Sequence, residues 1–385
     1  MTTGDLKASA RERLDGERDK LVALSHRIHA HPELAYEEER AAAWLTEYLA
    51  DAGMAVEAGI CDLPTAFAAR AGSGPLHVTI CAEYDALPGI GHACGHNLIA
   101  TMAAGAGVAL ARHADDAGLA VTVLGCPAEE AGNAGGKILL LERGAFAGTH
   151  AAMMVHPTPV DVAQPNMLAV ARFNVRYTGK EAHAAASPEL GINAADALTV
   201  AQVAIGLLRQ SIRGTDRIHG ITTHGGDAPN VIPAHTAATY LVRAETLDDL
   251  QTLIPRVFHC FEAGALATGA TLEIEGGERP YAQMRHHAAL AALYERNALA
   301  LGRTFVDAPV NGSTDMGNVS LAIPSIHPMI GVNSLPAVNH QPEFAAACVT
   351  PAADQSLYDG ALAMAWTALD LAADPALRDS LLAGR

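Results

Sequence analysis

Apolar positions in the first half of the chain alternate between short runs of strand length and longer segments of helical character. Trp44, Leu45, Tyr48 and Leu49, for example, recur at helical spacing. The expected elements are a helix over 37–54, a strand over 76–82, a helix over 97–112, a strand over 119–125, a helix over 136–143 and a strand over 151–155. Strands that alternate with helices indicate an α/β fold with a mostly parallel sheet and helices on both faces.

The pattern changes after Pro165. The expected elements there are a strand over 168–177, a helix over 191–212, strands over 218–224 and 235–245, a helix over 247–268 and a strand over 270–276. This β-α-β-β-α-β order is typical of a ferredoxin-like domain. Because the α/β pattern resumes with a helix over 284–302, we predict a discontinuous domain of residues 1–166 and 279–385, interrupted by an inserted domain of residues 167–278.

Composition and charge narrow the class of protein. The chain has 385 residues, of which 50% are hydrophobic, and a net charge of −17. This charge argues against nucleic acid as a partner, because phosphate binding needs a basic surface. No segment approaches the ~20 consecutive apolar residues of a membrane span. Six cysteines without the spacing of a disulfide framework, and no secretion signal, predict a reducing compartment and a cytoplasmic location.

Polar clusters follow three of the predicted strands. The first strand runs into Glu83–Pro88 and Gly91–Asn97, the second into Cys126–Glu130, and the third into His156. In open α/β sheets, ligands bind beyond the carboxyl ends of the strands. We therefore expect a cysteine, several histidines and several carboxylates to converge at one edge of the sheet.

These side chains suit a divalent metal. Cys94 and His96 lie two residues apart on a Gly-containing turn, and thiolate, imidazole and carboxylate together suit zinc or another first-row metal. Of Glu129 and Glu130, one carboxylate would bind metal and the other would take a proton from a metal-bound water. Each feature alone has an ordinary explanation, such as a buried cysteine, a solvated acidic pair or a structural His156. Their convergence favours a metal site.

Other chemistries lack their motifs. The chain has no Gly-x-Gly-x-x-Gly after the first strand, no Walker loop and no His-Glu-x-x-His. A Cys94 nucleophile with His96 as its base stays open. However, residues two apart on a turn rarely reach that geometry, and the adjacent glutamates would then have no role.

The motifs at 83–88 (EYDALP), 91–97 (GHACGHN), 127–130 (PAEE) and 312–315 (GSTD) resemble the aminoacylase/glutamate-carboxypeptidase family of two-metal peptidases. The Cys-Gly-His form is similar to the amidohydrolase branch. Asn97 and the GSTDMGNVS segment look closest to the B-type component of aminobenzoyl-glutamate hydrolase and to the β-alanyl-lysine-type dipeptidases. The resemblance implies a zinc-peptidase-like catalytic domain with an inserted lid and dimerisation domain.

The resemblance also implies which residues bind metal. The ligand candidates that match the family's motifs are Cys94, His96, Glu130, His156 and His340. Glu129 matches the general base, and Asp85 matches the acidic residue that orients a ligand. Glu83 stands where the carboxypeptidase branch has a ligand histidine, so the residue that bridges the metals is left open. Two divalent ions per chain are implied, with zinc expected and manganese, cobalt or nickel as alternatives.

Substrate contacts are expected from the inserted domain and from the chain after it. His183 matches the lid histidine that approaches the substrate carbonyl, a catalytic role in which it would hold the oxyanion together with a metal. The candidates for substrate binding are Asn230, Arg243, Arg279, Ser313 and Thr314. Arg279 matches a position that holds the substrate carboxylate in glutamate-specific relatives.

The implied activity is hydrolysis of an amide bond by a metal-bound water with Glu129 as general base, of aminoacylase, dipeptidase or carboxypeptidase type. The substrate would be an N-acyl amino acid, an aminobenzoyl-glutamate-like conjugate or a dipeptide. Two alternatives are a metal-dependent deaminase of an aromatic amine and a homologue that binds an amino-acid conjugate without turnover. The resemblance further implies a homodimer formed through the lid, with His183 acting either in its own site or in the partner's.

Overall fold

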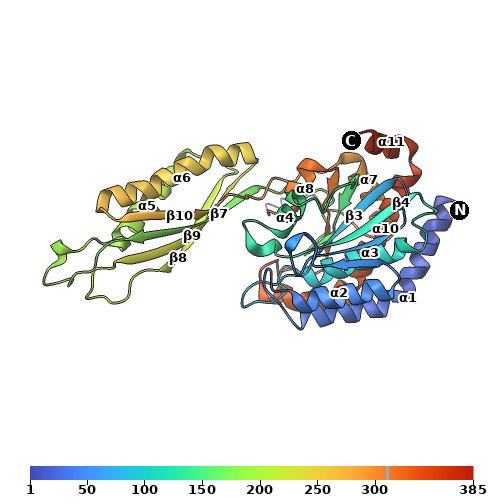
Figure 1. Cartoon of the computed structure of the whole chain (residues 1–385), viewed down its shortest axis with the longest axis horizontal. Helices are drawn as coiled ribbons and strands as arrows, with labels where there is room; N and C mark the ends of the chain where they lie inside the picture. Colours follow the sequence, from blue (N-terminus) through green and yellow to red (C-terminus); the bar gives the residue numbers. More distant parts are fainter. Residues whose placement is uncertain (309–311, 385) are drawn as a thin grey trace.

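The computed structural model describes residues 1–308 and 312–384, and consists of a larger body and an elongated extension (Figure 1). The extension is formed by the middle of the chain, and both termini lie on the larger body. Within the described residues, the search for a helix long and apolar enough to cross a bilayer finds none.

The larger body is built on a six-stranded sheet with the order β1-β2-β4-β3-β5-β11. Its strands are β1 (Ala55–Ala58), β2 (Phe67–Ala71), β3 (Leu76–Glu83), β4 (Leu119–Cys126), β5 (Ala151–Met153) and β11 (Ser325–Ile326). Four neighbouring strands, β4, β3, β5 and β11, run parallel, whereas β1 and β2 form an antiparallel edge. The predicted parallel sheet is therefore confirmed, with an antiparallel addition that the sequence pattern did not reveal.

Helices and short turns surround this sheet. The helices are α1 (Thr3–His29), α2 (Glu39–Asp51), α3 (His96–Ala111), α4 (Gly136–Glu142), α7 (Ala288–Ala300), α8 (Met316–Ala322), α9 (Pro342–Ala347), α10 (Pro351–Ala373) and α11 (Pro375–Ala383). Among the described residues, the 3-10 turns of this body are η1 (Ile60–Asp62) and η2 (Glu129–Ala131), and those of the extension are η3 (Pro188–Leu190) and η4 (Arg209–Ser211). A separate pair of parallel strands, β6 (His156–Thr158) and β12 (Met329–Gly331), extends beyond β5 and β11.

Helix α3 forms the centre of the larger hydrophobic core. It packs on β3 and β4, and α1 and α10 pack against it. Its residues His96 to Leu110 are all buried, which the run of alanines and glycines allows. A Cβ at Gly107 would stand 2.2 Å from Val123, and one at Gly105 would stand 3.0 Å from Leu21. Small side chains at these positions therefore let the neighbouring elements approach closely.

The extension is a four-stranded antiparallel sheet with the order β10-β7-β9-β8 and two helices on one face. Its elements are β7 (Ala169–Thr178), α5 (Ala194–Leu208), β8 (Arg217–His224), β9 (His235–Ala244), α6 (Leu247–Thr268) and β10 (Thr271–Gly276). Every second residue of β7 from Phe173 onward is buried against the helices, and the extension has a hydrophobic core of its own. The element order is the one predicted, and residues 167–278, the lid, remain the proposed inserted domain.

Differences at element ends have local causes. The helix predicted over 191–212 begins at Ala194 because the Asn193 side chain accepts hydrogen bonds from the backbone N–H groups of Ala195 and Asp196. The helix predicted over 284–302 begins at Ala288, where the His287 side chain accepts from the N–H of Leu290. Patterns of apolar spacing do not detect such caps.

Candidate functional site

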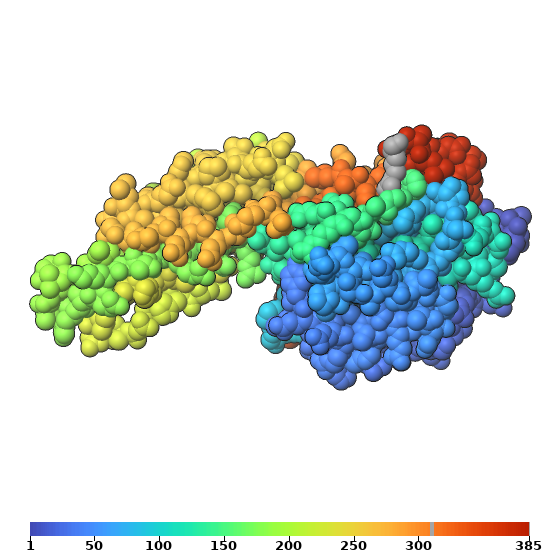
Figure 2. All heavy atoms as spheres, in the orientation of Figure 1, coloured from blue at the N-terminus to red at the C-terminus, as the bar shows by residue number. Residues whose placement is uncertain are grey.

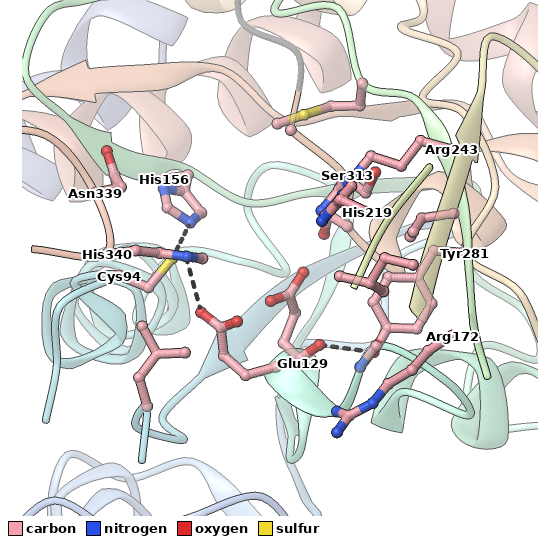
Figure 3. Close-up of a pocket in the computed structure, with 18 of the residues that line it drawn as sticks. Cys94, Glu129, His156, Arg172, His219, Arg243, Tyr281, Ser313, Asn339 and His340 are labelled. Atoms are coloured by element: carbon pink, nitrogen blue, oxygen red, sulfur yellow. Dashed lines mark hydrogen bonds and ion pairs between the residues drawn. The ribbon is translucent and has the colours of Figure 1, made fainter. Parts of the chain in front are cut away.

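A cavity of about 690 Å³ lies where the lid meets the carboxyl ends of the larger sheet. One wall comes from the β3–α3 loop, η2 and β6, and the opposite wall comes from the lid strands β7, β8 and β9. Figure 2 shows the narrower lid beside the larger body, and Figure 3 shows the residues that line this cavity. The predicted ligand candidates Cys94, Glu130, His156 and His340 all line it.

Cys94, His96 and His156 form the first group of possible metal ligands, with ligand atoms that all lie within 4.8 Å of one another. The sulfur of Cys94 is 3.4 Å from Nε2 of His156. Gly95 separates Cys94 from His96 in a left-handed conformation (φ 81°), and a Cβ there would stand 2.4 Å from Pro157. Glycine therefore allows Cys94 and His96 to approach the same point.

The second group joins Cys94 to the carboxylate turn and to the C-terminal part of the chain. Cys94, Glu130 and His340 again have ligand atoms within 4.8 Å of one another, and Nε2 of His340 lies 3.5 Å from Oε1 of Glu130. Glu129 and Glu130 occupy η2, between the left-handed residues Ala128 (φ 59°) and Gly132 (φ 69°). This turn directs both carboxylates toward the cavity (Figure 3).

Asp85 connects the two groups. Its Oδ1 lies 2.9 Å from Nδ1 of His96, and its Oδ2 accepts a hydrogen bond of 2.9 Å from the backbone N–H of Glu130. The first contact directs the other ring nitrogen of His96 toward the site. This is the geometry expected of a residue that orients a metal ligand.

The donor set fits a divalent metal. Nε2 of His96 and Oε1 of Glu130 are buried without a hydrogen-bond partner among the described residues, although buried polar atoms normally have one. Burial, together with the charge of Glu130, raises the pKa of the Cys94 thiol well above its ordinary value. Burial, followed by the charge of His96, lowers the pKa of His156 to about 4. A neutral imidazole is a competent ligand, and a bound cation would deprotonate the thiol.

Behind Glu129 lies a buried ionic cluster that the sequence analysis missed. Lys137, on α4, forms ion pairs with Glu83 and Asp315, and all three side chains are fully buried. Burial alone would lower the pKa of Lys137, but the charges of Asp315 and Glu83 raise it well above its ordinary value. The sequence contained one indication of this cluster, the single lysine in the apolar segment Gly136–Leu141. A lysine is almost never fully buried unless it is paired, so a lysine buried there would need a carboxylate partner.

The opposite wall of the cavity is cationic. Arg243 of β9 donates a hydrogen bond of 2.5 Å from Nη1 to Oγ of Ser313, and Thr314 lines the cavity next to them. Arg172 and His219, which the sequence analysis did not select, also line it from β7 and β8. The sequence offered little reason to select Arg172 and His219, because polar residues that alternate with buried ones along a strand usually face solvent.

Three residues that were predicted for catalysis or substrate binding lie elsewhere. His183, Asn230 and Arg279 are not among the described residues that line the cavity. Nδ1 of His183 accepts from the backbone N–H groups of residues 185 and 186, within an exposed loop of the lid. Nε of Arg279 lies 3.0 Å from the carboxylate of Glu142, and both side chains are exposed.

Comparisons with known proteins show what this chain is similar to. The family model Peptidase family M20/M25/M40 matches residues 80–361. The Xaa-Arg dipeptidase of Mus musculus is 41% identical, covering 98% of this chain and 91% of that protein. The B-type component of the p-aminobenzoyl-glutamate hydrolase of Escherichia coli (strain K12) is 34% identical, covering 68% of this chain and 58% of that protein. A dinuclear metal-binding M20 peptidase from Bacillus subtilis superposes with a TM-score of 0.66 at 22% identity, covering 91% of this chain and 98% of that one.

Proposed function

Because this chain belongs to peptidase family M20/M25/M40 and is a hydrolase of amide bonds, we propose that it is a two-metal dipeptidase whose general base is Glu129. The observation that carries this proposal is the cavity itself. One wall brings thiol, imidazole and carboxylate ligand atoms within 4.8 Å of one another, and the facing wall presents Arg243. A dipeptide with a free carboxylate matches both walls, because its amide bond would face the metal ligands and its carboxylate would face Arg243.

Cys94, His96, Glu130, His156 and His340 would hold the two divalent ions. When bound, these ions would lower the pKa of the attacking water and polarise the amide carbonyl. Zinc is the metal that we expect for this donor set, with manganese, cobalt or nickel as alternatives. The predicted cytoplasmic location stays a prediction.

The remaining steps belong to side chains of this chain. Glu129 takes a proton from the attacking water and then delivers it to the leaving amine, while Asp85 keeps His96 in its orientation. Arg243 binds the carboxylate of the substrate, and Ser313 holds the guanidinium in place. Burial, with the charges of Glu83 and Glu130 beside it, raises the pKa of Glu129 well above its ordinary value.

The substrate class is tested with a panel of X-Arg and X-Lys dipeptides, N-acetyl amino acids and aminobenzoyl-glutamate, with products identified by mass spectrometry. The relationship to Xaa-Arg dipeptidases makes dipeptides with a basic second residue the first substrates to test. We expect them to have the highest kcat/KM and to yield two fragments. Loss of ammonia would instead support the deaminase alternative, and no product from any compound would support the binding protein without turnover.

A C-terminally amidated copy of the best dipeptide is the matched control. It keeps the scissile bond but removes the carboxylate that Arg243 would bind. A charge-assisted hydrogen bond is worth about 1.5–3 kcal/mol, so kcat/KM should fall by roughly 10- to 100-fold. Equal rates for both compounds would mean that the cavity does not bind a terminal carboxylate.

We further propose a homodimer that forms through the lid. Strand β8 lies at the edge of the lid sheet, and Val203 (59% exposed) and Leu207 (69% exposed) present apolar surface on α5. An unpaired edge strand and apolar helix residues are features that a second copy would cover. His183 does not reach the cavity of its own chain, so it would complete the site of the partner.

Mixing two inactive variants tests this arrangement. His183→Ala and Glu129→Ala should each be nearly inactive as homodimers. If His183 acts in the partner's site, a mixed dimer has one site with both defects and one with neither, so up to about half of the wild-type activity per dimer should return. Mixed dimers without activity would refute action in the partner's site, and a monomer at all concentrations would refute the dimer.

A further inference from the structure

The turn that carries Glu129 and Glu130 has little regular structure of its own. It is the three-residue 3-10 turn η2, and left-handed residues flank it at both ends. A base and a metal ligand on such a turn need external support, because misplacement of about 1 Å can cost 10²-fold in rate.

Tyr281 supplies much of that support. Its hydroxyl donates a hydrogen bond of 2.6 Å to the backbone carbonyl of Glu129 and accepts one of 3.1 Å from the backbone N–H of Gly132 (Figure 3). The two bonds join both ends of the turn through one oxygen atom. Tyr281 is only 3% exposed, and its ring packs against Ile138 and Val170, so the hydroxyl is held firmly.

Tyr281 also lies where the chain returns from the lid to the larger body. Its backbone exchanges hydrogen bonds of 2.9 and 3.0 Å with Val170, which is near the start of the first lid strand, β7. From the same strand, Nη1 of Arg172 donates a bond of 3.1 Å to the carbonyl of Ala131. The two segments that connect the lid to the body, one at the start of β7 and one after β10, are therefore both bonded to the turn η2, which carries the proposed base.

We propose that Tyr281 is a positioning residue that couples the lid to the catalytic turn and keeps Glu129 in its reactive position. The inference rests on the proposed role of Glu129 as the general base. Tyr281 lines the cavity, but both hydrogen bonds of its hydroxyl go to the backbone of the turn. It acts through the backbone of the turn, so a displaced lid also displaces the base.

The test compares Tyr281→Phe with Tyr177→Phe. The control residue Tyr177 is equally buried and donates a hydrogen bond of 2.8 Å to the carbonyl of Phe261, but it lies in the lid core. Each change removes one hydroxyl and keeps the ring, so both variants should fold and lose a similar few degrees in Tm. Tyr281→Phe should lower kcat by about 10- to 100-fold with KM little changed. Tyr177→Phe should leave kcat unchanged.

Metal retention gives a second readout that does not depend on turnover. Because Glu130 is on the same turn, Tyr281→Phe should lose metal to EDTA faster than the wild type, measured by elemental analysis. Tyr177→Phe should lose metal at the wild-type rate. Equal kcat and equal metal loss in the two variants would overturn the proposal, because the hydroxyl of Tyr281 would then have a structural role alone.

The double variant Tyr281→Phe/Glu129→Gln separates this inference from the proposed function. If Tyr281 acts through Glu129, its removal should cause no further loss of kcat once the base is gone. A full additional loss would overturn the coupling. An inactive Glu129→Gln with a fully active Tyr281→Phe would refute the inference alone, whereas near-normal turnover by Glu129→Gln would refute the base assignment, and the coupling with it.

Discussion

Glu129→Gln should lower kcat by roughly 10²–10⁴-fold while both metal ions stay bound, because the amide cannot take a proton from water but keeps the shape of the side chain. Glu130→Gln, one residue away, should both lower activity and weaken metal binding. The difference follows from the proposed roles. Glu130 shares a group of ligand atoms with Cys94 and His340, whereas Glu129 shares one with Glu83 and His96 that the proposed ligand set does not use. Glu130→Gln is therefore a matched control for Glu129→Gln, because it removes the same negative charge one residue away.

Turnover and metal content have to be measured on the same preparations. Elemental analysis should find about two divalent ions per chain in the wild type and in Glu129→Gln, on the two-metal model, and fewer in Glu130→Gln. Near-normal turnover by Glu129→Gln would show that another group is the base. Active wild-type protein without stoichiometric metal, or full activity after exhaustive chelation, would refute the metal mechanism.

Lys137→Met should strongly destabilise the larger body. Lys137 is the cation between Glu83 and Asp315, and removing one member of a buried ionic group leaves uncompensated charge, which costs about 3–5 kcal/mol. The free energy of unfolding, measured with a chemical denaturant, should fall by this amount. The triple variant that adds Glu83→Gln and Asp315→Asn should recover part of the loss, because it removes the uncompensated carboxylates.

Lys20→Met is the control for this change. Lys20 also pairs with a carboxylate, that of Glu17, but its side chain is 68% exposed. Exposed pairs contribute about 0–1 kcal/mol, so this variant should be close to the wild type in stability. If Lys137→Met lowers the free energy of unfolding by no more than Lys20→Met does, the stability of the buried cluster does not depend on its lysine.

Several features of this protein were readable from the sequence because they depend on short stretches of chain. The alternation of apolar segments predicted the strands β3 and β4 and the helix α3 to within one residue at each end. The Cys94 and His96 motif ends the loop after β3, and the Glu129 and Glu130 motif follows β4 by a few residues. Since parallel neighbours end at one edge of a sheet, their convergence was predictable as well.

Strand order and strand ends needed more than local pattern. The strand predicted over 151–155 ends at Met153, and His156 instead begins β6, which pairs with β12 far along the chain. The edge strands β1 and β2 and the long buried helix α10 were not predicted. Their positions depend on which surfaces they cover, and a one-dimensional pattern does not contain that information.

The chemistry of the site also has a part that the sequence determines and a part that the tertiary structure decides. The candidate metal ligands and the candidate base lie in local motifs, so the sequence by itself determined which side chains are available for these roles. The pairing of Lys137 with Asp315, 178 residues apart, and the contact between the Tyr281 hydroxyl and the carbonyl of Glu129, 152 residues apart, were decided by the tertiary structure alone. The physical reason is that a buried charge or hydroxyl takes whichever partner the packing brings within reach, and only the folded chain selects that partner.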